Sequence, residues 1–390
     1  MSEAPGGPLA GLRIVELATV VAGPGVGKYL ADFGADVVKV EAPAGDPARR
    51  MGWTGPGEAD SYFFKLLNRN KRTVTLDLKS DEGRADFAAL VAGADALIEN
   101  MRPGKLAALG FPAEALLGLN PRLVILRVSG FGQDGPYAQH PGFATIAEGL
   151  SGFAALLGEP GGQPLLPPIA LTDEVTALVG AFALTAALHH AGRTGEGQEI
   201  DVNLLESMFQ IMGPLASAYA HLGYVQPRLG AGIPYTVPRG TYRCADGRWV
   251  AISSSSDGVA ARLLALVGLS GDPRFAGFQA RSANREALEE HVRAWVADRT
   301  ADEVIDAFRR VDAAIAPVLD MADVFRDPHF RARGTITEVD GVVMQNVVAR
   351  LSRTPARVRH AGRALGADTA AVLGEVRARA ATGSGAAGDG

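Results

Sequence analysis

A strand–helix–strand unit near the start of the chain constrains the fold more than any other feature. Residues 11–17 are predicted as a strand, a glycine-rich segment then opens a short helix that ends at Phe33, and residues 37–41 are predicted as the next strand. A unit of about thirty residues with this pattern makes its two strands parallel and lays the helix against one face of the sheet. The chain is therefore expected to contain an open α/β sheet.

Four more buried strands are predicted downstream, at residues 73–78, 96–100, 123–128 and 199–202. Ligands of open α/β sheets bind just beyond the carboxyl ends of the strands. The basic residues near these ends are Arg69, Lys71, Arg72, Lys79, Arg102 and Lys105. We interpret them either as a patch for a polyanionic ligand or as ordinary solvated charges.

The glycines after the first strand do not match a known nucleotide motif. Their spacing is G-x-G-x-G, which lacks the third glycine of the dinucleotide fingerprint, for which Glu41 would be the ribose-binding acid. A nicotinamide-dependent oxidoreductase is therefore a weak alternative. Lys28 is followed by Tyr29 instead of Ser or Thr, which excludes a P-loop. The glycines indicate either a generic phosphate cradle at a helix N-terminus or a tight turn without a ligand.

Asp173 stands where an apolar, strand-like stretch turns into a helix of small and apolar residues, which we expect Gly192 to close. Thr172 or Asp173 is expected to be the N-cap of this helix. At an N-cap, backbone N–H groups and the helix dipole stabilise an ionised carboxylate by roughly 0.3–1 kcal/mol. Asp173 is therefore either an ordinary cap or a nucleophilic carboxylate.

Composition excludes several classes of protein. Lys and Arg number 38 against 43 Asp and Glu, so no global basic field argues for nucleic acid or for an anionic membrane surface. Cys244 is the single cysteine, which leaves no intramolecular disulfide and no zinc-type cluster, and fits a cytoplasmic enzyme. No signal peptide and no uninterrupted run of 18 apolar residues is found, so no membrane span is expected.

The pattern changes after about residue 222. Asp246-Gly247 lies between two short strand-like runs and predicts a β-hairpin. Helices with few strands follow, and residues 314–318 are predicted as one more strand, so we expect a second, smaller α+β domain. Helices over residues 144–157 and 203–219 are expected before it, and a hairpin within residues 334–348 and a last helix after it.

Several short motifs occur together and in a fixed order. They are Pro8-Leu9-Ala10-Gly11 with Ala22-Gly23-Pro24, Asn70-Lys71-Arg72, Leu76-Asp77-Leu78-Lys79, Glu99-Asn100, Arg102-Pro103-Gly104, Gly130-Phe131-Gly132-Gln133-Asp134-Gly135-Pro136 and Thr194-Gly195-Glu196-Gly197-Gln198, followed by Ala316-Pro317-Val318 and Asp327-Pro328-His329-Phe330. With this order the chain resembles the family III CoA transferases, the group that includes formyl-CoA transferase, carnitine CoA transferase and alpha-methylacyl-CoA racemase. The resemblance covers nearly the whole chain.

The resemblance implies an α/β fold, with a Rossmann-like large domain around a parallel sheet and a smaller α+β domain inserted into it. Residues 1–221 would form the first part of the large domain, residues 222–321 the small domain, and residues 322–380 the return to the large domain. Residues 381–390, rich in Ala, Gly and Ser, are expected to be a disordered tail. The resemblance also implies a homodimer whose two subunits are interlocked.

The family's nucleophilic aspartate falls on Asp173. Its coenzyme A positions, with Lys105 added as a nearby basic group, fall on Val21, Ala22, Leu76, Lys79, Asn100, Met101, Arg102, Phe143 and Ala144. Two arginines that formyl-CoA transferase uses for the CoA phosphates are Ala42 and Ala108 here, so other basic groups must replace them. The resemblance implies coenzyme A and acyl-CoA as substrates, with no metal and no permanently bound cofactor.

The implied activity is CoA transfer from an acyl-CoA thioester to a carboxylic acid, through a mixed anhydride and a thioester of Asp173. An acyl-CoA racemase is the first alternative, and it needs an acid and a base on opposite faces of the α-carbon. The racemase histidine falls on Phe143, whose side chain has no ionisable proton, and His140 is the nearest substitute. A non-catalytic dimeric CoA-binding protein is a further alternative, disfavoured by the presence of Asp173. The sequence does not name the two acids.

Overall fold

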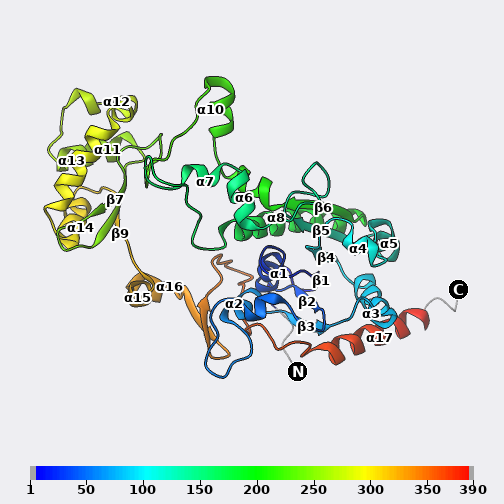
Figure 1. The fold of residues 1–390 in the computed structure, drawn as a ribbon. Coiled ribbons are helices and arrows are strands. Elements are labelled where there is room, and N and C mark those ends of the chain that lie inside the picture. Colours follow the sequence, from blue (N-terminus) through cyan, green and yellow to red (C-terminus); the bar gives the residue numbers. More distant parts are fainter. Residues whose placement is uncertain (1–5, 386–390) are drawn as a thin grey trace. The chain divides into compact units, whose positions relative to one another are not determined.

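The structure, a computed structural model, describes residues 6–385 and contains two compact units (Figure 1). Unit 1 comprises residues 1–151, 167–211 and 331–390, and unit 2 comprises residues 152–166 and 212–330. Unit 2 thus begins ten residues before the expected boundary at 222, ends after 321, and also takes a segment between residues 151 and 167. As a division into independently folding domains, the expected boundaries stay a prediction.

A six-stranded sheet forms the centre of unit 1. Its strands are β1 (Arg13–Leu17), β2 (Asp36–Glu41), β3 (Arg72–Thr75), β4 (Ala96–Glu99), β5 (Val124–Ser129) and β6 (Gln198–Asn203). All neighbouring pairs are parallel, and the order is β3-β2-β1-β4-β5-β6. The expected parallel sheet is confirmed, and the direction of the strand order reverses between β1 and β4.

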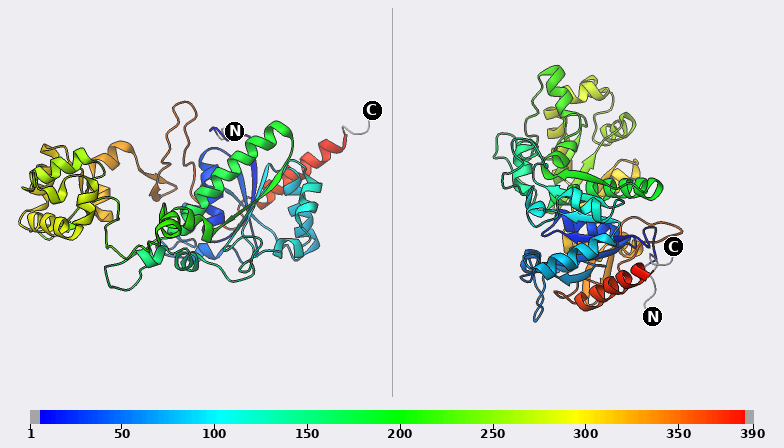
Figure 2. Two further views of the ribbon diagram at one scale, coloured as in Figure 1. Left: turned by 90° about the horizontal axis from the view of Figure 1, so that it is seen from above. Right: turned by 90° about the vertical axis from the view of Figure 1, so that its right-hand side faces the viewer.

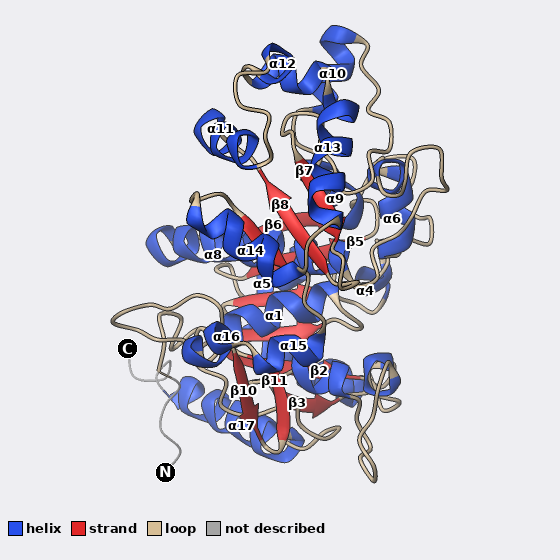
Figure 3. Ribbon diagram, turned by 90° about the vertical axis from the view of Figure 1, so that its left-hand side faces the viewer, coloured by secondary structure: helices blue, strands red, loops and turns tan. Residues whose placement is uncertain are grey.

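Helices cover both faces of this sheet (Figures 2 and 3). On one face lie α1 (Ala22–Asp32) and α8 (Leu171–Thr194), which pack against each other. On the other face lie α3 (Asp81–Ala92), α5 (Ala113–Leu119) and α17 (Thr369–Gly385). Alternate strand residues point to opposite faces, so Ile14 belongs to the first apolar core and Val15 to the second. A sheet buried on both faces explains why the strands read as nearly continuous apolar runs.

Shorter elements complete unit 1. They are the 3-10 helix η1 (Pro47–Arg50), α2 (Tyr62–Leu67), α4 (Lys105–Ala108), α6 (Ala144–Leu150), α9 (Leu204–Gln210), β10 (Ile336–Val339) and β11 (Val342–Gln345). The last two strands pair antiparallel and confirm the expected hairpin. Part of the expected disordered tail is helical, because α17 continues to Gly385, and residues 386–390 lie outside the described chain.

Three expected helix boundaries are wrong, and glycines in left-handed conformations explain them. The helix expected over residues 144–157 is divided into α6 and α7 (Phe153–Leu156) by Gly152, whose φ is 87°. The helix expected over residues 203–219 is divided into α9 and α10 (Leu215–Leu222), with Gly213 at a φ of 63° and Pro214 between them. Helix α8 passes Gly192 and ends at Gly195 with a φ of 79°.

Unit 2 contains a three-stranded antiparallel sheet and a group of helices, which is the α+β character that we expected. The strands are β7 (Arg239–Arg243), β8 (Trp249–Ser253) and β9 (Ile315–Pro317). The helices after the hairpin are α11 (Asp257–Leu266), η2 (Pro273–Phe275), α12 (Phe278–Ala283), α13 (Arg285–Ala297), α14 (Ala301–Arg310), α15 (Met321–Arg326) and α16 (Pro328–Arg333).

Helix α8 is, by length and composition, apolar enough to cross a membrane, with a mean hydropathy of 1.4 in its most apolar part. In this fold it packs against α1, β5 and β6, and Ala177, Leu184 and Leu188 belong to the core of unit 1. Its hydrophobicity on that side is therefore explained by the packing of the α/β layers.

Candidate active site

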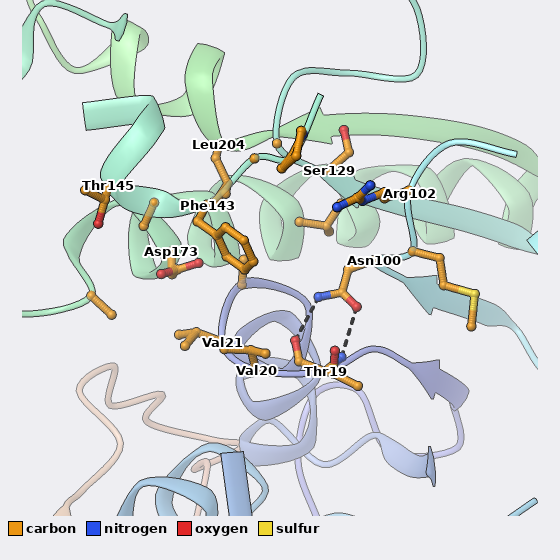
Figure 4. Close-up of a pocket in the computed structure, with 18 of the residues that line it drawn as sticks. Thr19, Val20, Val21, Asn100, Arg102, Ser129, Phe143, Thr145, Asp173 and Leu204 are labelled. Atoms are coloured by element: carbon orange, nitrogen blue, oxygen red, sulfur yellow. Dashed lines mark hydrogen bonds between the residues drawn. The ribbon is translucent and has the colours of Figure 1, made fainter. Parts of the chain in front are cut away.

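A cavity of about 400 Å³ lies beyond the carboxyl ends of β1, β4 and β5, where the strand order of the sheet reverses (Figure 4). Three loops line it: the β1–α1 loop at residues 19–22, the segment after β4 at residues 100–103, and the segment around residues 138–145 that leads into α6. Asp173 completes the wall from the start of α8. Ligands of doubly wound sheets bind at this position because two neighbouring loops diverge there.

Most of the expected site residues meet at this cavity. Asp173 lines it together with Val21, Ala22, Asn100, Met101, Arg102, Phe143 and Ala144. A second cavity of about 320 Å³ lies beyond β2 and β3, and it is lined by Leu76 and Lys79. The two cavities share Thr19, Asn100 and Met101, so they form neighbouring parts of one surface. Lys105 lines neither cavity and is exposed at the start of α4.

Asp173 is not a helix cap, so that expectation is wrong. Helix α8 begins at Leu171, its N-cap is Ala170, and no side chain caps it. Thr172 turns inward instead, where its hydroxyl donates a hydrogen bond of 2.9 Å to Glu148 Oε1. Asp173 is the third residue of the helix, half-buried, with its side chain at the cavity. The capping interpretation failed because the helix begins earlier than expected, which places Asp173 inside its first turn.

The surroundings of Asp173 favour its protonated form. Burial, followed by the nearby negative charges of Glu148 and Glu174, raises the pKa of Asp173 to about 6. Glu174 accepts hydrogen bonds from Lys28 Nζ at 3.1 Å and from the Tyr29 hydroxyl at 2.7 Å, both on α1. The ionised carboxylate that a nucleophile requires is therefore held in a costly environment and is more basic than an ordinary aspartate.

The β1–α1 loop facing Asp173 is held in an unusual conformation. Val20 has a φ of 67°, a strained value for a β-branched residue, and its N–H donates to Asp46 Oδ1 at 3.1 Å. Asn100 binds both backbone groups of Thr19, accepting from its N–H at 2.9 Å and donating to its carbonyl at 2.8 Å. These hydrogen bonds fix the loop that leads into α1, whose N-cap, Val21, and first residue, Ala22, line the cavity.

A fully buried group of charged side chains binds the backbone on both sides of that loop. Lys39 lies 3.2 Å from Glu16 and 2.8 Å from Asp46, and it donates to the Ala18 carbonyl at 2.7 Å. Lys71 lies 2.7 Å from Glu16. It also donates to the Pro24 carbonyl at 2.7 Å. Sequence reasoning missed Glu16, Lys39 and Asp46, because nothing in the local pattern distinguishes a buried charge from a solvated one.

Three of the six basic residues of the expected patch bind acidic side chains of the protein itself and are not placed to form a patch. Arg69 is buried and forks onto both carboxylate oxygens of Asp32. Arg72 binds Asp36 and Glu375. Lys71 is fully buried, and burial lowers its pKa to about 8 although Glu16 opposes the change. Lys79, Arg102 and Lys105 are exposed, and no ion pair is found for them within residues 6–385.

The glycines of the first βαβ unit allow close packing instead of forming a phosphate loop. All three lie inside α1, and none has a positive φ. A Cβ on Gly23 would lie 2.5 Å from the Ala18 Cβ, one on Gly25 would lie 2.7 Å from the Ala177 Cβ, and one on Gly27 would clash with Glu16. Helix α1 can therefore approach β1 and α8 closely. Glu41 is buried and pairs with Arg49 at 2.6 Å, so it is not available to a ribose, which removes the basis of the nicotinamide alternative.

The residues considered for a racemase also line the cavity. The Phe143 side chain is exposed there and offers no proton. His140 lines the cavity too, with its ring centroid 5.3 Å from that of Tyr137. Among the described residues, no group of three or more His, Cys, Asp and Glu side chains is placed to hold a metal ion.

Comparisons with known proteins test the resemblance that the sequence motifs indicate. The family model of CoA-transferase family III matches residues 9–369. The chain is 41% identical to the succinyl-CoA–L-malate CoA-transferase alpha subunit of Chloroflexus aurantiacus over 385 residues, covering 95% of this chain and 89% of the relative. It is 36% identical to the succinate–glutarate CoA-transferase of Agrobacterium fabrum over 383 residues, covering 95% and 96%.

A solved structure gives the same result for the fold. The crystal structure of a CAIB/BAIF family protein from Brucella suis superposes with a TM-score of 0.85 at 35% identity, covering 95% of this chain and all of that one. The resemblance inferred from the sequence motifs is thus confirmed. The chain belongs to CoA-transferase family III, and it is a CoA-transferase.

Proposed function

We propose that this CoA-transferase moves CoA from succinyl-CoA to a second dicarboxylic acid through covalent intermediates on Asp173. The observation that carries the proposal is the half-buried Asp173 carboxylate in the wall of a 400 Å³ cavity, opposite the loop that opens α1. Both relatives named above act, by their names, on dicarboxylic acids, and both names include succinyl-CoA or succinate.

In the first half of the proposed reaction, an Asp173 carboxylate oxygen attacks the carbonyl carbon of succinyl-CoA. The C–S bond breaks, CoA leaves as a thiolate, and a mixed anhydride of Asp173 and succinate remains. The thiolate then attacks the aspartyl carbonyl carbon, which releases succinate and leaves Asp173 as a CoA thioester. In the second half, the acceptor carboxylate attacks this thioester, and the released thiolate attacks the acceptor carbonyl of the new anhydride. Asp173 is thereby regenerated as a carboxylate.

Each step develops negative charge on a carbonyl oxygen, which needs preorganised hydrogen-bond donors. The N–H groups at the start of α1 have no partner within the helix, and Val21 and Ala22 line the cavity. We assign them as the donors. Lys79 and Arg102 are assigned to the CoA phosphates, because both are exposed cations on the shared surface of the two cavities. CoA enters and leaves as a substrate.

A panel of acceptors tests the function. Purified protein is incubated with succinyl-CoA and single acids, and the CoA esters are separated and identified by mass spectrometry. New CoA thioesters are expected with four- and five-carbon dicarboxylic acids such as L-malate and glutarate, and not with acetate or butyrate. Transfer to monocarboxylic acids alone would contradict the dicarboxylate assignment, and hydrolysis without transfer would contradict the covalent route.

The protein is further proposed to act as an interlocked homodimer in the cytoplasm. Each unit exposes apolar side chains that a partner could cover: Leu178, Val179 and Phe182 on α8 of unit 1, and Tyr219 and Leu222 on α10 of unit 2, a helix without any buried residue. Interlocked subunits cannot separate without unfolding, so sedimentation at nanomolar concentration should still show a dimer. A folded and active monomer would contradict this, and a requirement for a different second chain would place the protein in a pair like that of the relative named as an alpha subunit.

A further inference from the structure

A buried acid that the proposed reaction does not use lies beside the nucleophile. Glu148, on α6, is 3% exposed, and its Oε1 accepts the hydrogen bond of 2.9 Å from the hydroxyl of Thr172, the residue just before Asp173. Within the described chain, no Lys, Arg or His lies within ion-pair distance of Glu148. A buried carboxylate that is balanced only by a hydroxyl is costly, so its place next to the nucleophile calls for a functional explanation.

Other charged groups around Asp173 are balanced or exposed. On α8 itself, Glu174 is tied to Lys28 and Tyr29 of α1. The loops across the cavity contribute Arg102 and His140, and both are exposed to solvent. On α9, Glu206 is exposed and accepts a hydrogen bond from Asn203, and the uncharged Met208 Sδ lies 3.4 Å from the Thr172 hydroxyl. Glu148 is therefore the buried negative charge near Asp173 that no described cation compensates.

The repulsion between two such carboxylates acts in a poorly screened environment. It disfavours the state in which both are ionised, which makes the reactive carboxylate bind protons more strongly. This agrees with the pKa of Asp173, which is raised to about 6 mainly by burial and next by the negative charge of Glu148. A more basic carboxylate is also a better nucleophile toward a thioester carbonyl.

We propose that Glu148 acts through Asp173: its buried negative charge increases the nucleophilicity of the Asp173 carboxylate and raises the pH below which transfer stops. This proposal rests on the proposed function, because it assumes that Asp173 is the attacking group. Glu148 lies behind the first turn of α8 and not in the cavity wall, so it is a positioning residue and not a catalytic one.

Glu148→Gln is the sharpest variant, because glutamine keeps the size of the side chain and its Oε1 can still accept the Thr172 hydrogen bond. Loss of the charge should let Asp173 stay ionised at lower pH. The acidic limb of the pH profile of kcat/KM is therefore expected to move down by about half a pH unit or more. Thr172→Ser is the matched control, because it alters the same contact but keeps the hydroxyl and the charge, and its acidic limb should stay at the parental pH.

A second measurement does not depend on turnover. Protein with carbon-13 in the aspartate carboxyl groups is titrated by NMR, and the Asp173 signal is assigned by its absence in Asp173→Asn. The titration midpoint of Asp173 should be lower in Glu148→Gln than in the parent and in Thr172→Ser. An unchanged midpoint would overturn the proposal even if the parent is an active transferase, and so would an equal shift in Thr172→Ser. Failure of the acceptor panel would instead overturn the proposed function while the titration still decides the role of Glu148.

Discussion

Asp173→Asn is expected to abolish CoA transfer, with a loss of several orders of magnitude in kcat, while the protein still folds and binds CoA. Asparagine has almost the same shape as aspartate, but its amide is a far weaker nucleophile than a carboxylate, so no anhydride can form. Steady-state assays with succinyl-CoA give the loss, and calorimetric titration with CoA shows that binding persists. In the parent enzyme, hydroxylamine or borohydride added during turnover should modify one carboxylate, which mass spectrometry should locate on the peptide that contains Asp173.

The same substitution should stabilise the protein at neutral pH. The pKa of Asp173 is raised from its ordinary value of 3.8 to about 6, so the folded protein holds this proton more tightly than the unfolded chain. Below about pH 3.8 the group is protonated in both states and has no effect. As the pH rises past 6, ionisation of Asp173 lowers the free energy of unfolding by about 3 kcal/mol. Asparagine removes this cost, and denaturant unfolding should show the gain at pH 7 and its disappearance near pH 4.

Asp81→Asn provides the control, since Asp81 also lies in the first turn of a helix, α3, but is exposed. There the substitution should leave activity unchanged and lower stability by a few tenths of a kcal/mol, because favourable interactions with the helix dipole and with Arg84 are lost. If Asp173→Asn retains more than about a tenth of parental transfer, a difference of only about 1.4 kcal/mol in the barrier, the covalent mechanism is wrong.

The sheet and the position of Asp173 could be predicted because they follow from local patterns. Alternating strand and helix signals located all six strands of the parallel sheet to within a few residues, and the transition from loop to helix located the start of α8. The order of the strands could not be predicted in this way, because pairing joins segments as far apart as β5 and β6. The glycines of α1 were misread for a similar reason, since the atoms that they make room for belong to β1 and α8.

Burial of charge is where sequence reasoning failed most clearly. Lys71 and Lys79 are only eight residues apart, flank the same strand and have the same chemistry. One is fully buried against Glu16, and the other is exposed at the second cavity. Their difference depends on what β1 and β2 place beside them, which no local pattern contains. The raised pKa of Asp173 has the same origin, because burial is its first cause and the second, the charge of Glu148, comes from another helix.

These two lysines give the second large effect that we expect. Glu16, Asp46, Lys39 and Lys71 form a buried set with two negative and two positive charges. Lys71→Met leaves one negative charge unbalanced and also removes the donor to the Pro24 carbonyl. Removing one partner of a buried ion pair typically costs about 3–5 kcal/mol, so unfolding in urea at pH 7 should show a loss of this size. Adding Glu16→Gln to Lys71→Met restores a neutral set and should recover part of that stability.

Lys79→Met should behave in the opposite way, because this side chain is exposed and its proposed partner is a CoA phosphate. Its free energy of unfolding should stay within about 0.5 kcal/mol of the parent. Its Kd for CoA should rise about tenfold and depend less on salt, since one charge-assisted contact is lost. Equilibrium titration of CoA at low and high salt measures both effects. The opposite result would be a Lys71→Met variant that is as stable as the parent but binds CoA weakly, together with a Lys79→Met variant that binds CoA normally. In that case Lys71 would be the phosphate ligand, and the buried charges would not hold the β1–α1 loop in place.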